Sequence, residues 1–91
     1  CPLGPFIQTN FEQNPELGIK CFVNNELKQD GNTRDMIFSI GDILCFVSSI
    51  MTLLPGDVIL TGTPEGVSKV GPGDEIKIEI ETIGTLVNSI K

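Results

Sequence analysis

The sequence predicts a small domain of the mixed α+β class, mostly β, with one helix at about residues 40–53. Three observations lead to this prediction. Residues 76–80 alternate isoleucine with charged residues, which is the period of a strand with one wet face. Residues 43–54 repeat apolar residues at helical spacing. Turn signals cut the remaining chain into short segments, and this pattern favours a roll or a barrel.

The first predicted element is a hairpin over residues 19–30. Apolar residues alternate from Ile19 to Val23, and Asn24-Asn25 follows as the turn. Asparagine is the best residue after glycine for the positive φ of a type I′ turn. The returning segment, 26–30, is polar, so we expect it to be an exposed edge strand.

The predicted helix has start and stop signals. Ser39 and Asp42 have S-x-x-D spacing, so Ser39 can cap the helix while Asp42 faces its positive end. Pro55 restricts Leu54 and is expected to end the helix. The apolar face consists of Ile43, Leu44, Val47, Ile50, Met51 and Leu54.

Pro-Gly-Asp occurs twice, at 55–57 and at 72–74, and each time an apolar run follows. Proline followed by glycine fits the two central positions of a type II turn. The run after the first turn, 57–61, lacks alternation and predicts a strand buried on both sides. The second leads into the alternating strand, and Gly84 marks the turn into a last strand at 85–90.

Composition excludes several functions. The 91 residues carry 6 Lys+Arg against 12 Asp+Glu, a net charge of −6, so we expect no nucleic-acid partner. The longest apolar run, 43–47, is far too short to span a bilayer, so we expect no membrane partner. There is no histidine, which excludes a Ser-His-Asp triad, a Cys-His pair and an imidazole metal ligand within these residues.

Cys1, Cys21 and Cys45 are widely spaced and odd in number, which favours free thiols in a reducing compartment. Cys21 and Cys45 are expected to be small core residues. The chain opens with Cys1-Pro2 rather than methionine, which suggests a piece of a longer polypeptide.

Thr63 is the candidate binding residue. Pro64 pushes Thr63 toward extended geometry, and its β-branched side chain is stiff. Gly62 lets another molecule approach the backbone closely. A fixed hydroxyl beside an open backbone could orient a carboxylate or carbonyl. A turn whose hydroxyl is satisfied locally remains the alternative, and the residues alone favour it.

Other polar stretches favour structural roles. Residues 31–35 could form an anion nest with Arg34 as a clamp, but a turn between hairpin and helix is the favoured interpretation. Asp57 and Asp74 are expected to accept turn backbone N–H groups. Three carboxylates that alternate with isoleucine are expected to form a solvated face rather than a metal site: Glu75, Glu79 and Glu81.

Several stretches together resemble the C-terminal part of the fumarylacetoacetate hydrolase family. They are "DGNTRDMIF", "SSIMTLLPGDVILTGTPEGV" and "VGPGDEIKIEIETIGTLVNSI". "PLGPFI" and the N-P-x-L-x-I-x-x-x-V-N stretch from Asn14 to Asn24 match as well. The resemblance runs from about Pro2 to Ile90. Asn25 departs from it, because glycine is commoner at that position.

The resemblance implies a barrel-like β-roll, present here as a partial domain over residues 1–91, in a cytoplasmic homodimer, or in the mitochondrial matrix of a eukaryote. It implies a Mg²⁺ or Mn²⁺ ion that chelates a 2-oxo or enol acid. The reactions it implies are C–C bond hydrolysis of acylpyruvates or diketo acids, decarboxylation of oxaloacetate, and isomerisation or decarboxylation of hydroxy-dienedioates.

Carried over residue by residue, the resemblance makes Thr63 a contact of the substrate carboxylate, with Gly62 lining the same pocket. The family's metal ligands, its lysine and its lid precede the part matched here, so no catalytic and no metal residue is assigned in this chain. Glu79-Ile80-Glu81 has the Glu-x-Glu sequence of the family's metal-binding pair but lies at a different position, so it is not assigned as metal ligands. The alternative function is a non-catalytic domain that serves assembly or binding.

Overall fold

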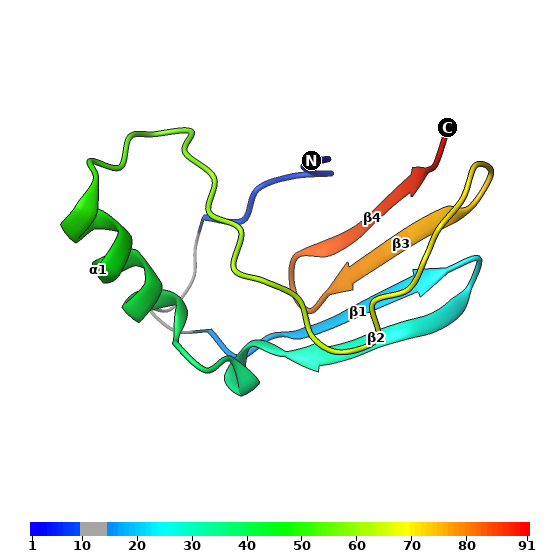
Figure 1. The fold of residues 1–91 in the computed structure, drawn as a ribbon, viewed down its shortest axis with the longest axis horizontal. Helices are drawn as coiled ribbons and strands as arrows, with labels where there is room; N and C mark the ends of the chain where they lie inside the picture. The colour runs from blue at the N-terminus through cyan, green and yellow to red at the C-terminus, as the bar shows by residue number, and fades with distance from the viewer. Residues whose placement is uncertain (10–14) are drawn as a thin grey trace.

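The computed structural model describes residues 1–9 and 15–91, so the prediction at Asn14 lies outside the described residues. Four strands form one antiparallel sheet in the order β2-β1-β3-β4, and one helix lies to the side of it (Figure 1). The elements are β1 (Gly18–Val23), β2 (Glu26–Asn32), the 3₁₀ helix η1 (Thr33–Asp35), α1 (Ile40–Ile50), β3 (Glu75–Ile80) and β4 (Gly84–Ser89). The mostly β architecture with one helix confirms the predicted class.

The predicted hairpin is confirmed. Asn24 and Asn25 have φ of 51° and 64°, and two consecutive positive values are what a type I′ turn requires. β2 is the edge strand of the sheet, as its polar sequence predicted. The pairing is irregular at one point, because Cys21 faces Gln29 while Phe22 faces Leu27. Lys28 is therefore an extra residue on β2, which makes this a β-bulge.

The helix begins as predicted and ends early. The Ser39 hydroxyl accepts the Asp42 N–H at 3.1 Å and the Asp42 carboxylate accepts the Ser39 N–H at 3.3 Å, which is the reciprocal capping box. Met51 is already extended, with φ −141° and ψ 153°, so the predicted end at residue 53 was wrong. The Leu54 N–H donates to the Asp57 carboxylate at 2.8 Å. This local bond replaces the helical bond that a longer helix would need.

The predicted buried strand at 57–61 is absent in this chain. Residues 58–61 have no regular secondary structure and pair with none of the four strands of the sheet. Val58 and Leu60 are 56% and 79% exposed. An apolar sequence favours a strand, but a strand also requires a neighbour to accept its backbone hydrogen bonds, and no strand in the described part of the chain pairs with this segment.

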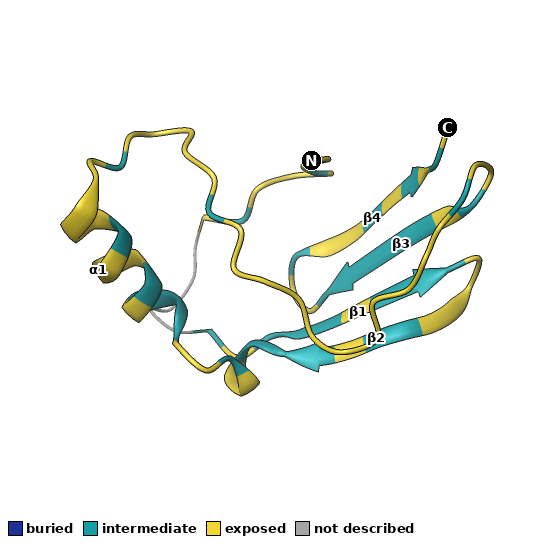
Figure 2. Cartoon of the chain, viewed as in Figure 1, coloured by how far each residue is buried: buried dark blue, intermediate teal, exposed yellow. Residues whose placement is uncertain are grey.

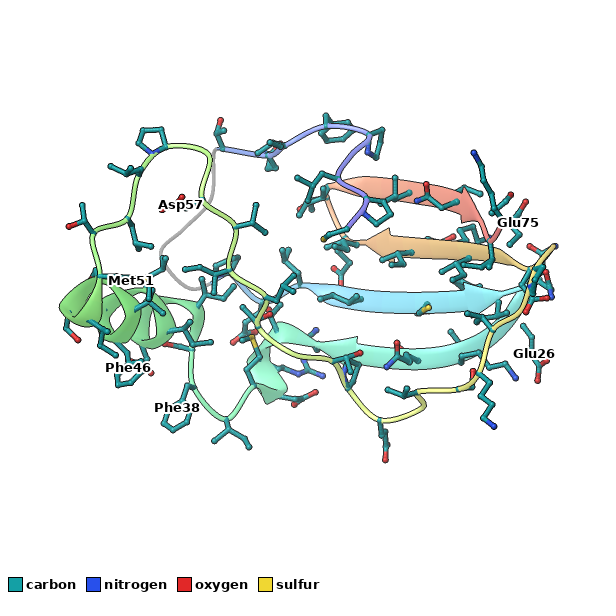
Figure 3. The ribbon with its side chains drawn as sticks, turned by 45° about the horizontal axis from the view of Figure 1, so that its top comes forward. Glu26, Phe38, Phe46, Met51, Asp57 and Glu75 are labelled. Carbon is teal, nitrogen blue, oxygen red and sulfur yellow. The ribbon has the colours of Figure 1, made fainter. Side chains whose placement is uncertain are left out.

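The described residues form no closed hydrophobic core. None of them is fully buried, as Figure 2 shows by its lack of dark blue. Phe38 and Phe46 are 66% and 67% exposed and point away from the sheet (Figure 3). Cys45 on α1 is exposed, so its prediction as a core residue was wrong, because the described residues leave that position uncovered. Cys21 is half-buried, and all three thiols are free.

The dimensions agree with this open arrangement. The accessible surface is 7132 Å², whereas a compact monomer of this mass would expose about 5,200 Å². The radius of gyration is 14.4 Å, against about 12 Å for a compact domain of this length. The excess of about 1,900 Å² is more than one partner contributes to an ordinary protein interface, roughly 800 Å². Within the described residues, no helix has the length and apolarity to cross a membrane.

Candidate functional site

The predicted site residues lie in a loop beside the edge of the sheet. Residues 62–66 follow the unpaired segment 58–61 and pass along β2 (Figure 1). Gly62 has φ +101°, and a side chain built there would meet no atom within 4 Å. Thr63 is exposed. The structure therefore places an accessible hydroxyl next to an open stretch of backbone, an arrangement that the residues allowed but did not favour over a locally satisfied turn.

A side chain that the sequence analysis missed holds this loop. The Gln29 amide on β2 donates from Nε2 to Oγ1 of Thr63 at 2.7 Å and to the carbonyl oxygen of Pro64 at 2.7 Å. These bonds join residues 34 and 35 positions apart. No short-range pattern marks Gln29, since it reads as one more polar residue on an exposed edge. Only the docking of the loop on β2 reveals it.

Two glycines permit the close approach of loop and strand. A Cβ at Gly66, which has φ +103°, would overlap the carbonyl oxygen of Lys28, the bulge residue. A Cβ at Gly31 would lie 3.2 Å from two carbons of the Pro64 ring. Larger residues at either position would push the loop away from Gln29. The Thr-Gly-Thr-Pro segment is thus positioned by contacts at the bulge residue Lys28 and at Gly31 beyond it.

Residues 31–35 lead from the hairpin toward the helix, as Gly31 and Asn32 end β2 and Thr33–Asp35 form η1. Asn32 caps η1 by accepting the Arg34 N–H at 3.0 Å. Thr33 accepts the Leu17 N–H at 2.8 Å and donates to the Pro15 carbonyl at 2.6 Å. Arg34 lies 4.0 Å from Asp35, and both are largely exposed. The structural interpretation of this stretch is confirmed.

Two carboxylates at and just after the end of β3 have different partners. Glu79 on β3 pairs with Lys77 at 3.5 Å, whereas Glu81, which follows β3, accepts the Gly18 N–H at 2.7 Å. Glu79, Glu81 and Gly18 border a hollow of about 670 Å³ at one end of the sheet, and no residue of the Thr63 loop lines it. In the described part of the chain, no group of three or more His, Cys, Asp or Glu side chains could hold a metal ion. The donor set present therefore does not fit the divalent ion that the resemblance implies.

Asp74 closes a separate network at the start of β3. Its carboxylate accepts the Gly71 N–H at 2.8 Å and the Asn24 amide at 2.9 Å. The Asn24 oxygen in turn accepts the Glu75 N–H at 2.9 Å. The Gly71 N–H and, to a lesser degree, the Asn24 amide lower the pKa of Asp74 below its usual value, because both bonds favour the charged form. The network joins the hairpin turn to β3 at the end of the sheet where Figure 3 labels Glu26 and Glu75.

The chain resembles known proteins over its whole length. A 4-hydroxyphenylacetate degradation bifunctional isomerase/decarboxylase from Salmonella dublin is 48% identical over 91 residues, which cover 98% of this chain and 21% of that protein. The structure of 2-hydroxyhepta-2,4-diene-1,7-dioate isomerase from Mycobacterium marinum superposes with a TM-score of 0.93 at 47% identity, over 99% of this chain and 35% of that one.

A second similar structure contains ligands. Maleylpyruvate hydrolase from Sphingobium sp. SYK-6, in complex with manganese(II) ion and pyruvate, has a TM-score of 0.93 at 42% identity, over 99% of this chain and 35% of that one. This chain thus spans about a third of the length of these solved relatives. The family model described as fumarylacetoacetate (FAA) hydrolase C-terminal matches residues 1–91. The chain therefore belongs to the fumarylacetoacetate hydrolase family.

Proposed function

We propose that this chain forms the substrate-facing wall of a metal-dependent enzyme that acts on 2-oxo or diketo acids. The reaction is C–C bond hydrolysis of an acylpyruvate-type substrate, or isomerisation or decarboxylation of a hydroxy-dienedioate. Thr63 binds the carboxylate end of the substrate, and Gly62 lines the same pocket. In this proposal residues 1–91 are the C-terminal portion of a catalytic domain in a cytoplasmic homodimer.

The observation that carries the proposal is the state of the Thr63 hydroxyl. Its oxygen accepts the Gln29 amide at 2.7 Å, so its own hydrogen is free to donate. The hydroxyl is exposed and Gly62 leaves the space beside it open. A free hydroxyl donor suits a carboxylate or carbonyl oxygen. The related hydrolase with bound pyruvate supports a ligand of that chemistry.

A divalent ion, Mg²⁺ or Mn²⁺, would come with ligands outside the described residues, since no suitable cluster occurs among them. Such an ion stabilises the negative charge that develops on a 2-oxo acid as its bond breaks. The part played by this chain is to orient the acid end of the substrate. We therefore expect the 91-residue chain alone to have no turnover.

The test compares Thr63→Val with Thr63→Ser in the full-length protein, meaning this chain together with the additional length that its relatives carry. Acetylpyruvate, oxaloacetate and a hydroxy-dienedioate are assayed with Mg²⁺ and with Mn²⁺. A hydrogen bond to a charged group contributes roughly 1.5–3 kcal/mol, so Thr63→Val should raise KM about tenfold to a hundredfold. Thr63→Ser retains the hydroxyl and should stay within about threefold of the unmodified protein.

Two results would contradict the proposal. An unchanged KM in Thr63→Val would remove Thr63 from the substrate site. The absence of turnover for every 2-oxo acid, with a folded protein and either metal, would favour the alternative of a non-catalytic domain that serves assembly or binding.

A further inference from the structure

Both hydrogens of the Gln29 amide are committed to the loop that carries Thr63. A glutamine Nε2 has two hydrogens, and the two bonds at 2.7 Å direct one to Thr63 and one to Pro64. Gln29 is half-buried. The second bond fixes the backbone immediately after Thr63, so one side chain sets both the position of the hydroxyl and the course of the chain that bears it.

The direction of the first bond decides what Thr63 can recognise. A hydroxyl has one hydrogen to donate and lone pairs that accept. The Gln29 nitrogen can only donate, so the Thr63 oxygen accepts and its hydrogen points elsewhere. With its stiff β-branched side chain, Thr63 then presents a donor to whatever lies beside Gly62. That arrangement suits an acceptor oxygen and disfavours a ligand group that can only donate.

The sheet determines where the Gln29 side chain points. Gln29 pairs with Cys21 directly after the bulge at Lys28, and a bulge changes the direction of the neighbouring side chains. The loop meets β2 at this same place, because Gly66 lies against the Lys28 carbonyl and Gly31 lies against the Pro64 ring. Contacts on three residues of one strand, Lys28, Gln29 and Gly31, thus hold the loop in place.

We infer that Gln29 is a positioning residue, which holds Thr63 and polarises its hydroxyl so that it donates to an acceptor oxygen of the ligand. This inference rests on the proposed function, since it assigns Gln29 to the same site. It gives the edge strand a role in selecting acids, and it predicts that the selection is lost when the amide is replaced by an apolar side chain of equal length.

The experiment uses the full-length protein with pyruvate as the probe, in the presence of manganese. Four variants are compared with the unmodified protein: Gln29→Met, Thr63→Val, the double variant, and Asp30→Asn. Asp30 is a matched control, because it is exposed on the same strand and adjacent residues of a strand point to opposite faces. Calorimetry measures the pyruvate Kd, manganese binding is measured without pyruvate, and thermal melting reports folding.

We expect Gln29→Met to raise the pyruvate Kd about fivefold to thirtyfold and Thr63→Val about tenfold to a hundredfold. The double variant should stay within about twofold of Thr63→Val, because Gln29 acts through Thr63 and the two effects then do not add. Manganese affinity should be unchanged in all variants, and Asp30→Asn should bind pyruvate like the unmodified protein.

The outcomes distinguish the substrate-binding role of Thr63 from the positioning role of Gln29. If Thr63→Val weakens pyruvate binding but Gln29→Met does not, the proposed function survives and the positioning role is wrong. Additive effects in the double variant would also overturn the role, since Gln29 would then act independently of Thr63. If neither variant changes the pyruvate Kd, both the Thr63 site and the inference built on it fail.

Discussion

Two turns that share the sequence Pro-Gly-Asp are followed by different structures in this molecule. In the segments 54–57 and 71–74 the central glycines have φ of 94° and 90°. In each turn the aspartate N–H donates to the first residue's carbonyl at 3.1 Å. In each turn the aspartate carboxylate accepts the first residue's N–H at 2.8 Å. The second turn leads into β3, which pairs with β1 and β4, whereas the first leads into a segment outside every strand.

The comparison shows that near neighbours in the sequence suffice to form a turn, whereas a strand requires partners from elsewhere in the chain. Proline, glycine and aspartate satisfy the turn from within four residues, so both copies form alike. The following strand requires partners, and β3 has one on each side. Asp74 also accepts the Asn24 amide from the hairpin, whereas Asp57 has only its local bond among the contacts of the described residues. Tertiary neighbours therefore decide which run becomes a strand.

The largest expected effect tests whether the unpaired run is covered in the full-length protein. Leu60 and Val67 are similarly exposed in this chain, at 79% and 76%. We expect Leu60→Ala to lower the free energy of unfolding by about 2–4 kcal/mol, because an apolar run of this kind would be buried as a strand. Val67→Ala should change it by less than about 0.5 kcal/mol. Urea denaturation measures both, and equal small losses would mean that the run stays on the surface.

A smaller effect tests whether the two turns are equivalent. Gly73→Ala and Gly56→Ala each place a Cβ at a strongly positive φ, which costs roughly 1–2 kcal/mol. Neither position has an atom within 4 Å of the added carbon, so conformation alone sets the loss. We expect equal losses in the full-length protein by thermal and urea unfolding. A loss confined to Gly73→Ala would show that only the turn before β3 must keep its geometry.

The smallest effect concerns pH and is specific to the second turn. Because the folded pKa of Asp74 is lowered, its contribution is present above the unfolded pKa, about 4, and is lost as the pH falls through the folded value. Asp74→Asn should therefore reduce the fall in urea midpoint between pH 6 and pH 3. Asn24→Gly, which retains the positive φ of the turn, should reduce it only in part. A full acid dependence in Asp74→Asn would contradict this assignment.

Much of the fold could be predicted because its signals lie within a few residues. The asparagine pair at 24–25, the S-x-x-D cap at 39–42 and the alternating strand after Asp74 were predicted from local pattern and are confirmed. Although the residues beside it favoured a locally satisfied turn, they also allowed Thr63 to present a fixed hydroxyl next to an open backbone. Its role in binding a substrate stays a prediction, because accessibility and hydrogen bonding do not by themselves identify a ligand.

Most of the failures concern contacts over long distances in the chain, and the exception is the end of the helix, where Leu54 bonds the nearby Asp57. Cys45 and the run at 57–61 were expected in a core, but burial depends on what covers a surface, and apolar sequence alone does not supply the cover. The end of the helix depended on a competing carboxylate at Asp57. Gln29 could not be found, because its partners are 34 and 35 residues away.

The sequence by itself determined the turns, the caps and the alternation of strands, since each is satisfied by hydrogen bonds and sterics among near neighbours. Only the tertiary structure decided that the Thr63 loop lies on β2 at its bulge and that Gln29 fixes the hydroxyl there. It also decided that one of two apolar runs pairs while the other does not. Pairing and burial require a second surface, and its presence depends on the whole arrangement of the chain.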